Sequence, residues 1–446
     1  MGEDLHHAPE PEEPAPAHSG VDFPQHDRAP REAAPSAAGA PPNCEDNKHD
    51  LHTTETGPRK GLASALKDAG AGGETPEYWG ALTEAMDAWG DSEAPLDSRP
   101  QWFDEARFRR GQQFATDYLF GLMLAEMLSL LVLFSFADGL QPLISTRKSD
   151  TPFKAFRRYL STVTRVRSWY EGDPWAVDGA ARRNLRAVRS MHAAVRGKLN
   201  SNSPSPSSLG LEGPLWSDLL AEVRGDHAAA CPFGSASLVY SRPRDRRLFV
   251  NQADMAFTQF GFVGLMLVYP ARFGAAGASD EALDGFAHLW RTIGYLLGVE
   301  DRYNFCAGSL AEVRRRSEDL LRLCVRPNLR DVTADWEHMS RCMVEGISYY
   351  VPGLSFETSL CYLDTLLGVD CPRLWAAMTL WQRFMFRLMW LVMCWVLRLP
   401  GALPLHNWLL RVSLKSAETY SPARLARLER RRYAYQDAGP AVCTRL

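Results

Sequence analysis

The chain has 446 residues, of which 46% are hydrophobic, 11% aromatic and 23% charged, and this globular composition excludes collagen-like, fully disordered and disulfide-scaffold proteins. Lys and Arg (50) nearly balance Asp and Glu (53), and the net charge of -3 argues against nucleic-acid binding, which needs a basic surface to neutralise phosphates. The nine cysteines form no CxxC pair, so the sequence predicts neither a thiolate zinc site nor a complete disulfide framework, and we expect a reducing compartment.

The N-terminal region, residues 1–75, is predicted to be disordered. Nine of the 29 prolines fall within its first 42 residues, and it has too few large apolar side chains to offset the entropy cost of ordering. Six of the 11 histidines also lie here, at irregular spacings that fit weak adventitious metal binding better than a defined site. The first residues, MGEDLHHAPEPEEPAP, have neither the basic start nor the apolar core of a secretory signal peptide, so we expect an intracellular protein.

Residues 115–137 are predicted to form one long apolar helix, interrupted by Asp117 and Glu126. Such a run is long enough to cross a bilayer, but a helix that is apolar on every side is also what the centre of a large all-α domain requires. Because Glu126 would be costly in lipid, the buried-core interpretation is favoured.

Further helices are expected at residues 153–170 and 180–197, separated by the turn EGDPW, and then at 251–268, 280–297 and 309–323. Residues 198–245, rich in Ser, Pro and Gly, are interpreted as a loop insertion, and the C-terminal third, 336–408, as mostly apolar helix. No strand pattern and no repeat of 20–50 residues is visible. The sequence therefore predicts an all-α fold with a single large helical domain at residues 76–412 and a basic tail at 413–446.

A second apolar segment lies near the C-terminus, LWAAMTLWQRFMFRLMWLVMCWVLRLPGALP, and is interrupted by Arg383, Arg387 and Arg398. Only ten uninterrupted apolar residues remain, Leu388 to Leu397, which is short for a membrane span. With the basic stretch RLARLERRRYAY that follows, residues 375–432 could lie at a membrane surface and contact anionic headgroups. A core helix followed by a solvated basic helix explains the same pattern equally well.

The chain lacks GxGxxG, phosphate-loop, GxSxG and HExxH motifs, so histidine chemistry is what remains to consider. His192 shares one helix face with Leu185, Val188 and Val195 and is expected to point toward the core. A lone histidine on such a face is more often a structural core residue than a ligand. An imidazole in this setting is nonetheless what an iron porphyrin needs as its proximal ligand.

The preceding helix carries a polar stripe, in which Arg158, Thr162, Arg165 and Trp169 recur at helical spacing. Two cations, a hydroxyl and an indole on one stripe can hold the propionates of a porphyrin and a polar ligand. The alternative is a solvated basic face with a loosely packed Trp.

These two segments, RRYLSTVTRVRSWYEGDPW and NLRAVRSMHAAVRG, together resemble the haem-b oxygenase family that contains bacterial latex-clearing protein (rubber oxygenase) and the fungal ER-bound oxygenase mpaB of mycophenolic acid biosynthesis. The family spacing Arg-x3-Thr-x29-His matches Arg158, Thr162 and His192. Two later segments, NQADMAFTQFGFVGLMLVYPARFG and FAHLWRTIGYLLGVEDRYNFC, resemble the arthropod branch of the same family. The resemblance covers roughly residues 100–400.

The resemblance implies a globin-like helical core around one haem b, with His192 as the proximal iron ligand and Arg158, Thr162 and Arg165 near the haem. It further implies a mono- or dioxygenase that acts with O2 on an apolar, unsaturated, isoprenoid or lipid-like substrate, with the ER membrane as a candidate location. In the family's best-known member, O2 cleaves a double bond of the substrate. Thr162 would hydrogen-bond the reacting oxygen and Arg158 would stabilise developing negative charge.

Two differences from the family pattern weaken the expectation that this chain cleaves a double bond. The family's rubber oxygenase has a lysine directly before the threonine, where this chain has Ser161. Its upstream glutamate corresponds to Pro142, and the nearest acids are Asp138 and Asp150. A non-catalytic haem- or lipid-binding protein is therefore an alternative, and a membrane scaffold with spans at 115–137 and 375–397 is another.

Downstream polar residues are interpreted as a structural network, in which Asp254, Thr258 and Gln259 find partners in a second group. That second group comprises Arg291, Glu300, Asp301 and Arg302. His288 is the leading alternative haem ligand, although no family position supports it.

Overall fold

The computed structural model of the chain describes residues 76–201, 211, 219–230 and 248–437, which belong to one compact unit. Within these ranges the structure is helical, and its only bridge of β type joins Trp89 to Asn251. The all-α prediction is confirmed for this part of the chain. Residues 1–75, for which disorder was predicted, lie outside the described residues, as do the six histidines there.

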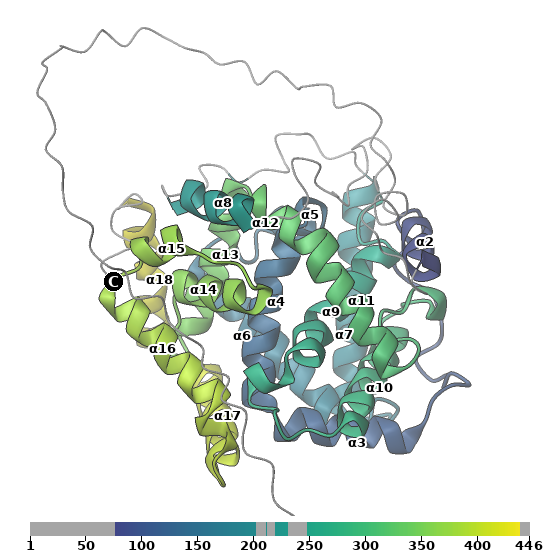
Figure 1. Cartoon of the computed structure of the whole chain (residues 1–446). Coiled ribbons are helices and arrows are strands. Elements are labelled where there is room, and N and C mark those ends of the chain that lie inside the picture. Colours follow the sequence, from purple (N-terminus) through teal and green to yellow (C-terminus); the bar gives the residue numbers. More distant parts are fainter. Residues whose placement is uncertain (1–75, 202–210, 212–218, 231–247, 438–446) are drawn as a thin grey trace, which may run out of the picture. The chain divides into compact units, whose positions relative to one another are not determined.

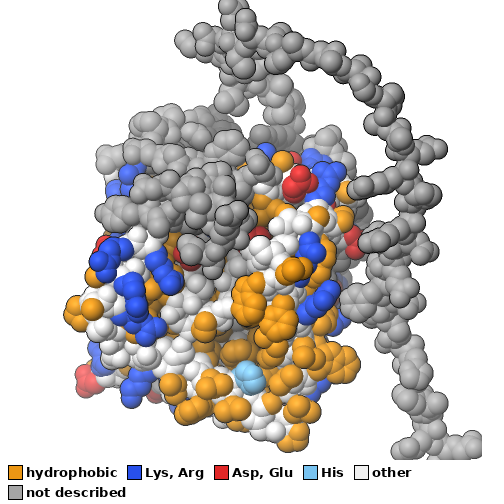
Figure 2. Space-filling model, turned by 90° about the vertical axis from the view of Figure 1, so that its left-hand side faces the viewer, with side chains coloured by type: hydrophobic (Ala, Val, Ile, Leu, Met, Phe, Trp, Pro, Cys, Tyr) orange, Lys and Arg blue, Asp and Glu red, His pale blue; other side chains and the backbone are white. Residues whose placement is uncertain are grey.

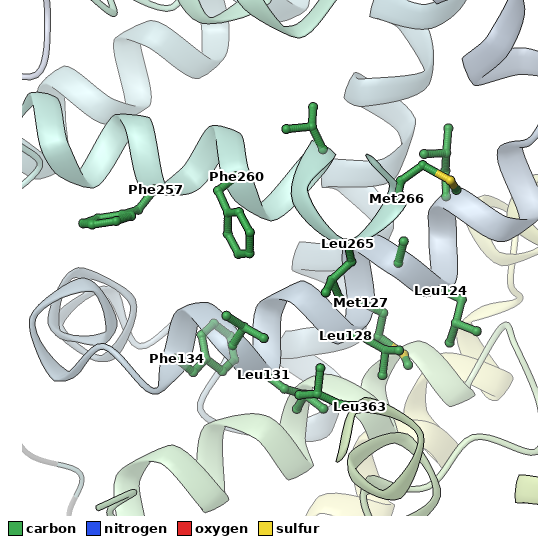
Figure 3. Close-up of a cluster of buried hydrophobic side chains, with 14 of the residues drawn as sticks. Leu124, Met127, Leu128, Leu131, Phe134, Phe257, Phe260, Leu265, Met266 and Leu363 are labelled. Carbon is green, nitrogen blue, oxygen red and sulfur yellow. The ribbon is translucent and has the colours of Figure 1, made fainter. Parts of the chain in front are cut away.

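Helix α4 (Leu119–Phe134) forms the centre of the fold. Its side chains are buried on nearly all sides, and it packs most closely against α9 (Gln252–Val268). Figure 3 shows Leu131 and Phe134 of α4 beneath Phe257 and Phe260 of α9. Burial of these side chains, at about 1.5–3 kcal/mol for each, supplies much of the driving force for folding.

The predicted single helix at 115–137 is wrong in its boundaries. The apolar run belongs to two helices, α3 (Glu105–Asp117) and α4, which meet at Tyr118 at an angle of 89°. Helix α3 begins at Asp104, whose carboxylate accepts the backbone N–H of Arg107. It crosses α10 (Asp280–Leu296) at Gly111, where a Cβ atom would lie 2.2 Å from the carbonyl oxygen of Gly285. Close approach of these two backbones therefore requires glycine.

Helices α6 (Pro152–Glu171) and α7 (Ala180–Ser201) confirm the predicted helices at 153–170 and 180–197. Thr151 caps α6 and Pro152 occupies its first turn, where a missing N–H costs nothing. Helix α6 packs against α13 (Ala334–Ser348), and α7 folds back along α6 (Figure 1).

The segment 198–245, predicted as a loop insertion, contains helical structure in its described part. Helix α7 extends to Ser201, and α8 (Leu219–Ala230) follows. The buried carboxylate of Asp226 accepts the backbone N–H of Leu374, at 2.9 Å, in α15 (Pro372–Ala377), and Nε2 of His227 lies 3.1 Å from Asp364 in α14 (Phe356–Leu367). These polar contacts attach α8 to the body of the fold.

Shorter elements connect the main helices. They are α2 (Pro76–Ala85), α5 (Ala137–Thr146), η3 (Pro270–Phe273), η4 (Asp301–Tyr303), α11 (Leu310–Leu320), the π-helical turn η5 (Leu321–Val325) and α12 (Arg326–Arg330). The helices predicted at 251–268, 280–297 and 309–323 correspond to α9, α10 and α11 with η5.

The C-terminal helices α16 (Leu380–Cys394) and α17 (Ala402–Glu418) lie along one side of the molecule (Figure 1), with η6 (Val396–Arg398) between them and α18 (Pro422–Asp437) after them. The predicted boundary at residue 412 thus falls inside α17. Among the described residues, one helical stretch, Leu380–Arg398, has the length and hydropathy to cross a membrane, and the bent pair α3–α4 would add a second.

Candidate functional site

The predicted site residues lie on the antiparallel pair α6 and α7. Nδ2 of Asn184 in α7 donates a 2.9 Å hydrogen bond to Oγ of Ser168 in α6, which fixes how the two helices are aligned. Ser161 lies about two turns before Ser168 on α6, and His192 lies about two turns after Asn184 on α7. Because the helices are antiparallel, Ser161 and His192 lie at a similar level. The family-pattern histidine therefore faces the segment that carries Arg158 and Arg165.

His192 is half-buried, and its Nδ1 atom is buried without a hydrogen-bond partner among the described residues. Burial, together with the positive charges of Arg196 and Arg158, lowers the pKa of His192 to about 4, against the opposing effect of Asp91. The imidazole is therefore neutral at pH 7, which is the form that coordinates a metal.

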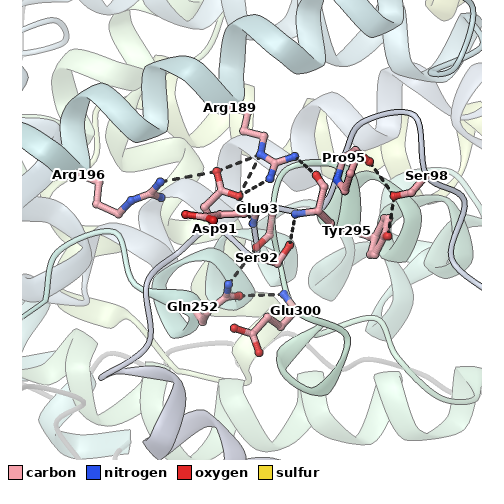
Figure 4. A network of polar contacts seen from close by, with 12 residues as sticks. Asp91, Ser92, Glu93, Pro95, Ser98, Arg189, Arg196, Gln252, Tyr295 and Glu300 are labelled. Atoms are coloured by element: carbon pink, nitrogen blue, oxygen red, sulfur yellow. Dashed lines mark hydrogen bonds and ion pairs between the residues drawn. The ribbon is translucent and has the colours of Figure 1, made fainter.

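Helix α7 is held in place by Asp91, a residue that the sequence did not single out. The Asp91 carboxylate accepts hydrogen bonds from Nε of Arg189, at 3.0 and 3.1 Å, and lies 3.6 Å from Arg196 (Figure 4). Burial alone would raise the pKa of Asp91, but the hydrogen bonds from Arg189 and from the Glu93 backbone, with the nearby guanidinium charges, lower it. Arg189 and Arg196 stand three positions before and four positions after His192, so all three side chains share one face of α7.

Arg158 joins α6 to the end of α5, because its guanidinium lies 3.4 Å from both the Thr146 and Ser149 hydroxyls. The positive charge of Arg158 also contributes to the lowered pKa of His192. Thr162 is exposed, and its hydroxyl donates to the carbonyl of Arg158 within the same helix, at 3.1 Å. The Arg158 guanidinium is thus engaged at the end of α5, and the Thr162 hydroxyl is engaged in its own helix.

Arg165 donates to the Ser161 carbonyl at 3.1 Å, yet its Nε atom is buried without a partner among the described residues. Trp169, at the end of the polar stripe, is buried against Trp290, and its indole nitrogen also lacks a partner in the described part of the chain. The four residues of the polar stripe are therefore not all exposed to solvent, and they do not form one continuous site.

The residues present fit an iron porphyrin. Buried polar atoms normally have partners, so the unpartnered nitrogens of His192 and Arg165, on facing helices, indicate a polar group that they can bind. A neutral imidazole suits an axial iron ligand, and a guanidinium suits a propionate. No group of three or more His, Cys, Asp or Glu side chains among the described residues could hold a metal ion, but porphyrin iron requires only one protein ligand here.

His288, the alternative ligand, has a structural role. Its ring lies between Phe103 and Trp102, and Nε2 accepts the backbone N–H of Asp104 at 3.1 Å. Burial lowers its pKa to about 4, and the charges of Arg107 and Arg291 act in the same direction. His288 therefore helps to fix the start of α3.

The predicted downstream network does not form with the predicted partners among the described residues, and only Gln259 joins two helices, through other residues. Its side-chain amide bonds the carbonyl of Trp290 and the side chain of Asn304, each at 3.0 Å, so it joins α9 to α10. Asp254 belongs instead to the capping box at the start of α9, and Thr258 is exposed. Arg291 pairs with Asp301 and Arg302 with Glu300 near the surface.

Glu126 of α4 is a second buried ionisable group. The hydroxyl of Tyr170 donates to its carboxylate at 2.9 Å. Burial raises the pKa of Glu126 to about 8, against the smaller opposing effect of the Tyr170 hydrogen bond. The carboxyl group is therefore mostly protonated at pH 7.

The chain is similar in sequence to a known protein family. No curated protein matches the chain. Among solved structures, latex clearing protein LCP in the closed state is similar over 79% of this chain and 88% of that chain, with 17% sequence identity and a TM-score of 0.44. The model of the family described as ER-bound oxygenase mpaB/B'/rubber oxygenase, catalytic domain, matches residues 113–400, which is more than half of the chain. The chain therefore belongs to the ER-bound oxygenase mpaB/B'/rubber oxygenase family.

Proposed function

We propose that this member of the family is a haem-b-dependent oxygenase that acts with O2 on an apolar, unsaturated substrate of isoprenoid or lipid-like kind. The observation that carries the proposal is the neutral imidazole of His192, with a buried and unpartnered nitrogen, at the position of the family-pattern histidine. When bound, haem b would supply the iron at which O2 is activated.

In this proposal His192 is the proximal iron ligand, and Asp91 holds its helix through Arg189. Arg158 and Arg165 bind the propionates by charge-assisted hydrogen bonds. Thr162 would hydrogen-bond the reacting oxygen, which requires its hydroxyl to leave the Arg158 carbonyl. Ser161 cannot supply the positive charge of the lysine found in rubber oxygenase, and Pro142 cannot supply a carboxylate.

The exposed apolar side of α16 and α17 supports a membrane contact within residues 375–432. Trp381, Phe384 and Trp395 on α16 and η6, and Trp408 on α17, are all exposed. Figure 2 shows hydrophobic side chains gathered on this side of the molecule, with Lys and Arg at its borders. An apolar substrate would reach such a protein from the bilayer, and α4, which is buried, would not be a span.

Visible absorption of the full chain, reconstituted with haem and compared with His192→Ala and His288→Ala, tests the proposal. We expect a Soret band that His192→Ala abolishes or shifts and that His288→Ala retains, since Nε2 of His288 is already bonded. If the wild-type protein is helical but shows no Soret band after reconstitution with haem, the oxygenase proposal is wrong. Haem binding without O2 consumption on any unsaturated lipid would instead favour the non-catalytic haem protein suggested by Ser161 and Pro142.

A further inference from the structure

A pocket of about 200 Å³ lies between α4, α14, α16 and α17. This volume exceeds that of the cavity of about 150 Å³ that holds a benzene molecule in an engineered protein core. Five methionines line it, Met123, Met127, Met385, Met389 and Met393, together with Leu, Val, Ile and Phe side chains. Flexible thioethers adapt to ligands of irregular shape, so the walls suit a chain that can adopt several conformations.

Of the two hydrogen-bonding side chains in the lining, Thr358 is engaged through its hydroxyl and His406 through one ring nitrogen. The Thr358 hydroxyl accepts from Ser355, at 2.9 Å, and donates to the Gln382 carbonyl. Nδ1 of His406 bonds the Ala402 carbonyl within α17, at 2.7 Å. The interior therefore offers a ligand little besides apolar contact, which selects a hydrocarbon and disfavours a polar metabolite.

The pocket reaches the exposed apolar side of the molecule through α16. Trp381, Phe384, Leu388, Leu391 and Trp395 recur at helical spacing and form an outer stripe, and Leu388, which is 37% exposed, also lines the pocket. On α17 the exposed residues Leu405, Trp408, Leu409 and Val412 form a second stripe. One face of α16 is thus exposed, while the adjacent face of the same helix lines the pocket.

The charge of residues 371–417 indicates which kind of partner binds the exposed stripes of α16 and α17. Residues 371–417 contain no Asp or Glu but six cations, Arg373, Arg383, Arg387, Arg398, Arg411 and Lys415. Arg373 and Arg411 pair with acids of other helices, and the other four form no ion pair among the described residues. Exposed tryptophans with flanking arginines are typical of a helix at the interface of an anionic bilayer. A second copy of this chain would place these like charges against each other, so an anionic membrane is the better occupant.

We propose that this pocket binds the hydrocarbon chain of a lipid drawn from an anionic membrane on which α16 and α17 lie. None of Arg158, Thr162, Arg165 and His192 lines it, so it is a second site, distinct from the candidate haem site. This proposal depends on the membrane contact proposed above only for the route by which the lipid enters the pocket. Binding inside the pocket requires neither haem nor O2.

Photocrosslinking of the wild-type full chain gives the direct test. A palmitate probe with a diazirine in its chain, and a matching geranylgeraniol probe, would distinguish acyl from isoprenoid ligands, and peptide mass spectrometry would locate the label. We expect saturable labelling at Met123, Met127, Met385 or Met389 by at least one probe. Labelling that is non-saturable, or that maps only outside the pocket lining, overturns the proposal.

Variants separate the pocket from the two other proposed surfaces. Met389→Trp, or Leu354→Trp if the first does not fold, fills the pocket and should weaken binding of a fluorescent fatty acid at least tenfold. Val177→Trp, at a position 75% exposed and outside the lining, should leave that affinity unchanged. His192→Ala should also bind the fatty acid normally, so failure of the haem proposal would not affect this one. Unchanged affinity in a folded pocket-filling variant would refute the site.

Discussion

Asp91 accepts two hydrogen bonds from Nε of Arg189, a residue 98 positions further along the chain and one turn before His192. Helix α7 buries few of its side chains, chiefly Ala181, Leu185 and Leu199 among the apolar ones. Apolar packing alone would therefore hold the second half of α7 weakly. The Asp91 contacts to Arg189 and Arg196 therefore attach this half of α7, which carries His192, to the segment before α3.

Asp91→Asn should destabilise the fold and loosen α7. Both partners of the Asp91–Arg189 pair are 14% exposed, so removing the negative charge leaves guanidinium groups poorly compensated, at a cost of about 2–4 kcal/mol. Urea denaturation followed by circular dichroism measures this cost. Asp97→Asn is the matched control, because Asp97 also pairs with an arginine of α7 but is 73% exposed, and we expect a loss below about 1 kcal/mol. Equal losses in the two variants would contradict the role given to Asp91.

The sequence predicts well those elements whose pattern is local. Helices α6, α7, α9 and α10 are recognisable from apolar periodicity and caps, and their predicted ends agree with the structure to within a few residues. The bend at Tyr118 escaped prediction because Asp117 is interpreted from the sequence as a polar residue within one helix, and no glycine or proline stands at residues 117–119 to mark a break. Helix α8 was missed because Ser- and Pro-rich stretches surround it.

In the candidate site, too, spacing along one helix could be predicted from the sequence, whereas contacts between distant segments could not. The face that joins Arg189, His192 and Arg196 is readable from spacing, but its acidic partner Asp91 lies in a distant, irregular segment. The exposure of Thr162 could not be predicted, since a stripe at helical spacing does not reveal which neighbours cover it. Likewise, α16 is apolar on nearly all sides, so only the fold distinguishes its pocket face from its outer stripe.

Glu126→Gln should stabilise the protein, by more at pH 8 than at pH 5. The folded-state pKa of about 8 exceeds the ordinary value of 4.5, so the folded state binds more protons than the unfolded state between these values. Stability of the wild type therefore falls as pH rises through that window, by about 1.4 kcal/mol for each unit of the shift as an upper limit. Glutamine keeps an oxygen that can accept from Tyr170 without the cost of ionisation.

Thermal denaturation of wild type and Glu126→Gln at pH 5, 6.5 and 8 measures this difference. Glu171→Gln serves as the control, because its side chain is 42% exposed and should show almost no such trend. A gain in Tm that is the same at every pH would show that Glu126 is ionised in the fold.

Arg341→Met should be strongly destabilising. Nε of Arg341 bonds Glu337 at 2.8 Å, and its terminal nitrogen bonds Glu357 at 2.6 Å, with all three side chains buried. Glu357 also accepts from Gln382 of α16 at 2.7 Å, so the network attaches α16 to the body. Removing the cation takes the charge of Arg341 away from two buried carboxylates, at a cost of about 3–5 kcal/mol.

The measurement is the free energy of unfolding in urea, with Arg322→Met as control because Arg322 is 44% exposed in its pair with Asp319. We also expect limited proteolysis to cut near α16 earlier in Arg341→Met than in the wild type, because that helix loses its polar attachment. Stability within about 1 kcal/mol of the wild type would show that the buried network contributes little.

Trp381→Glu combined with Trp395→Glu should abolish binding to anionic vesicles while leaving the fold intact. Both side chains are more than 60% exposed, so their replacement removes no core contact but places two carboxylates in the stripe that faces the lipid. Flotation with phosphatidylserine vesicles measures binding, and circular dichroism verifies the fold. High salt should weaken wild-type binding by screening the six cations of residues 371–417, yet leave the part contributed by the tryptophans. Val177→Glu, exposed and outside both stripes, should float like the wild type. If the double variant floats as well as the wild type does, α16 and α17 do not form the membrane contact, and the pocket would have to be filled from solution.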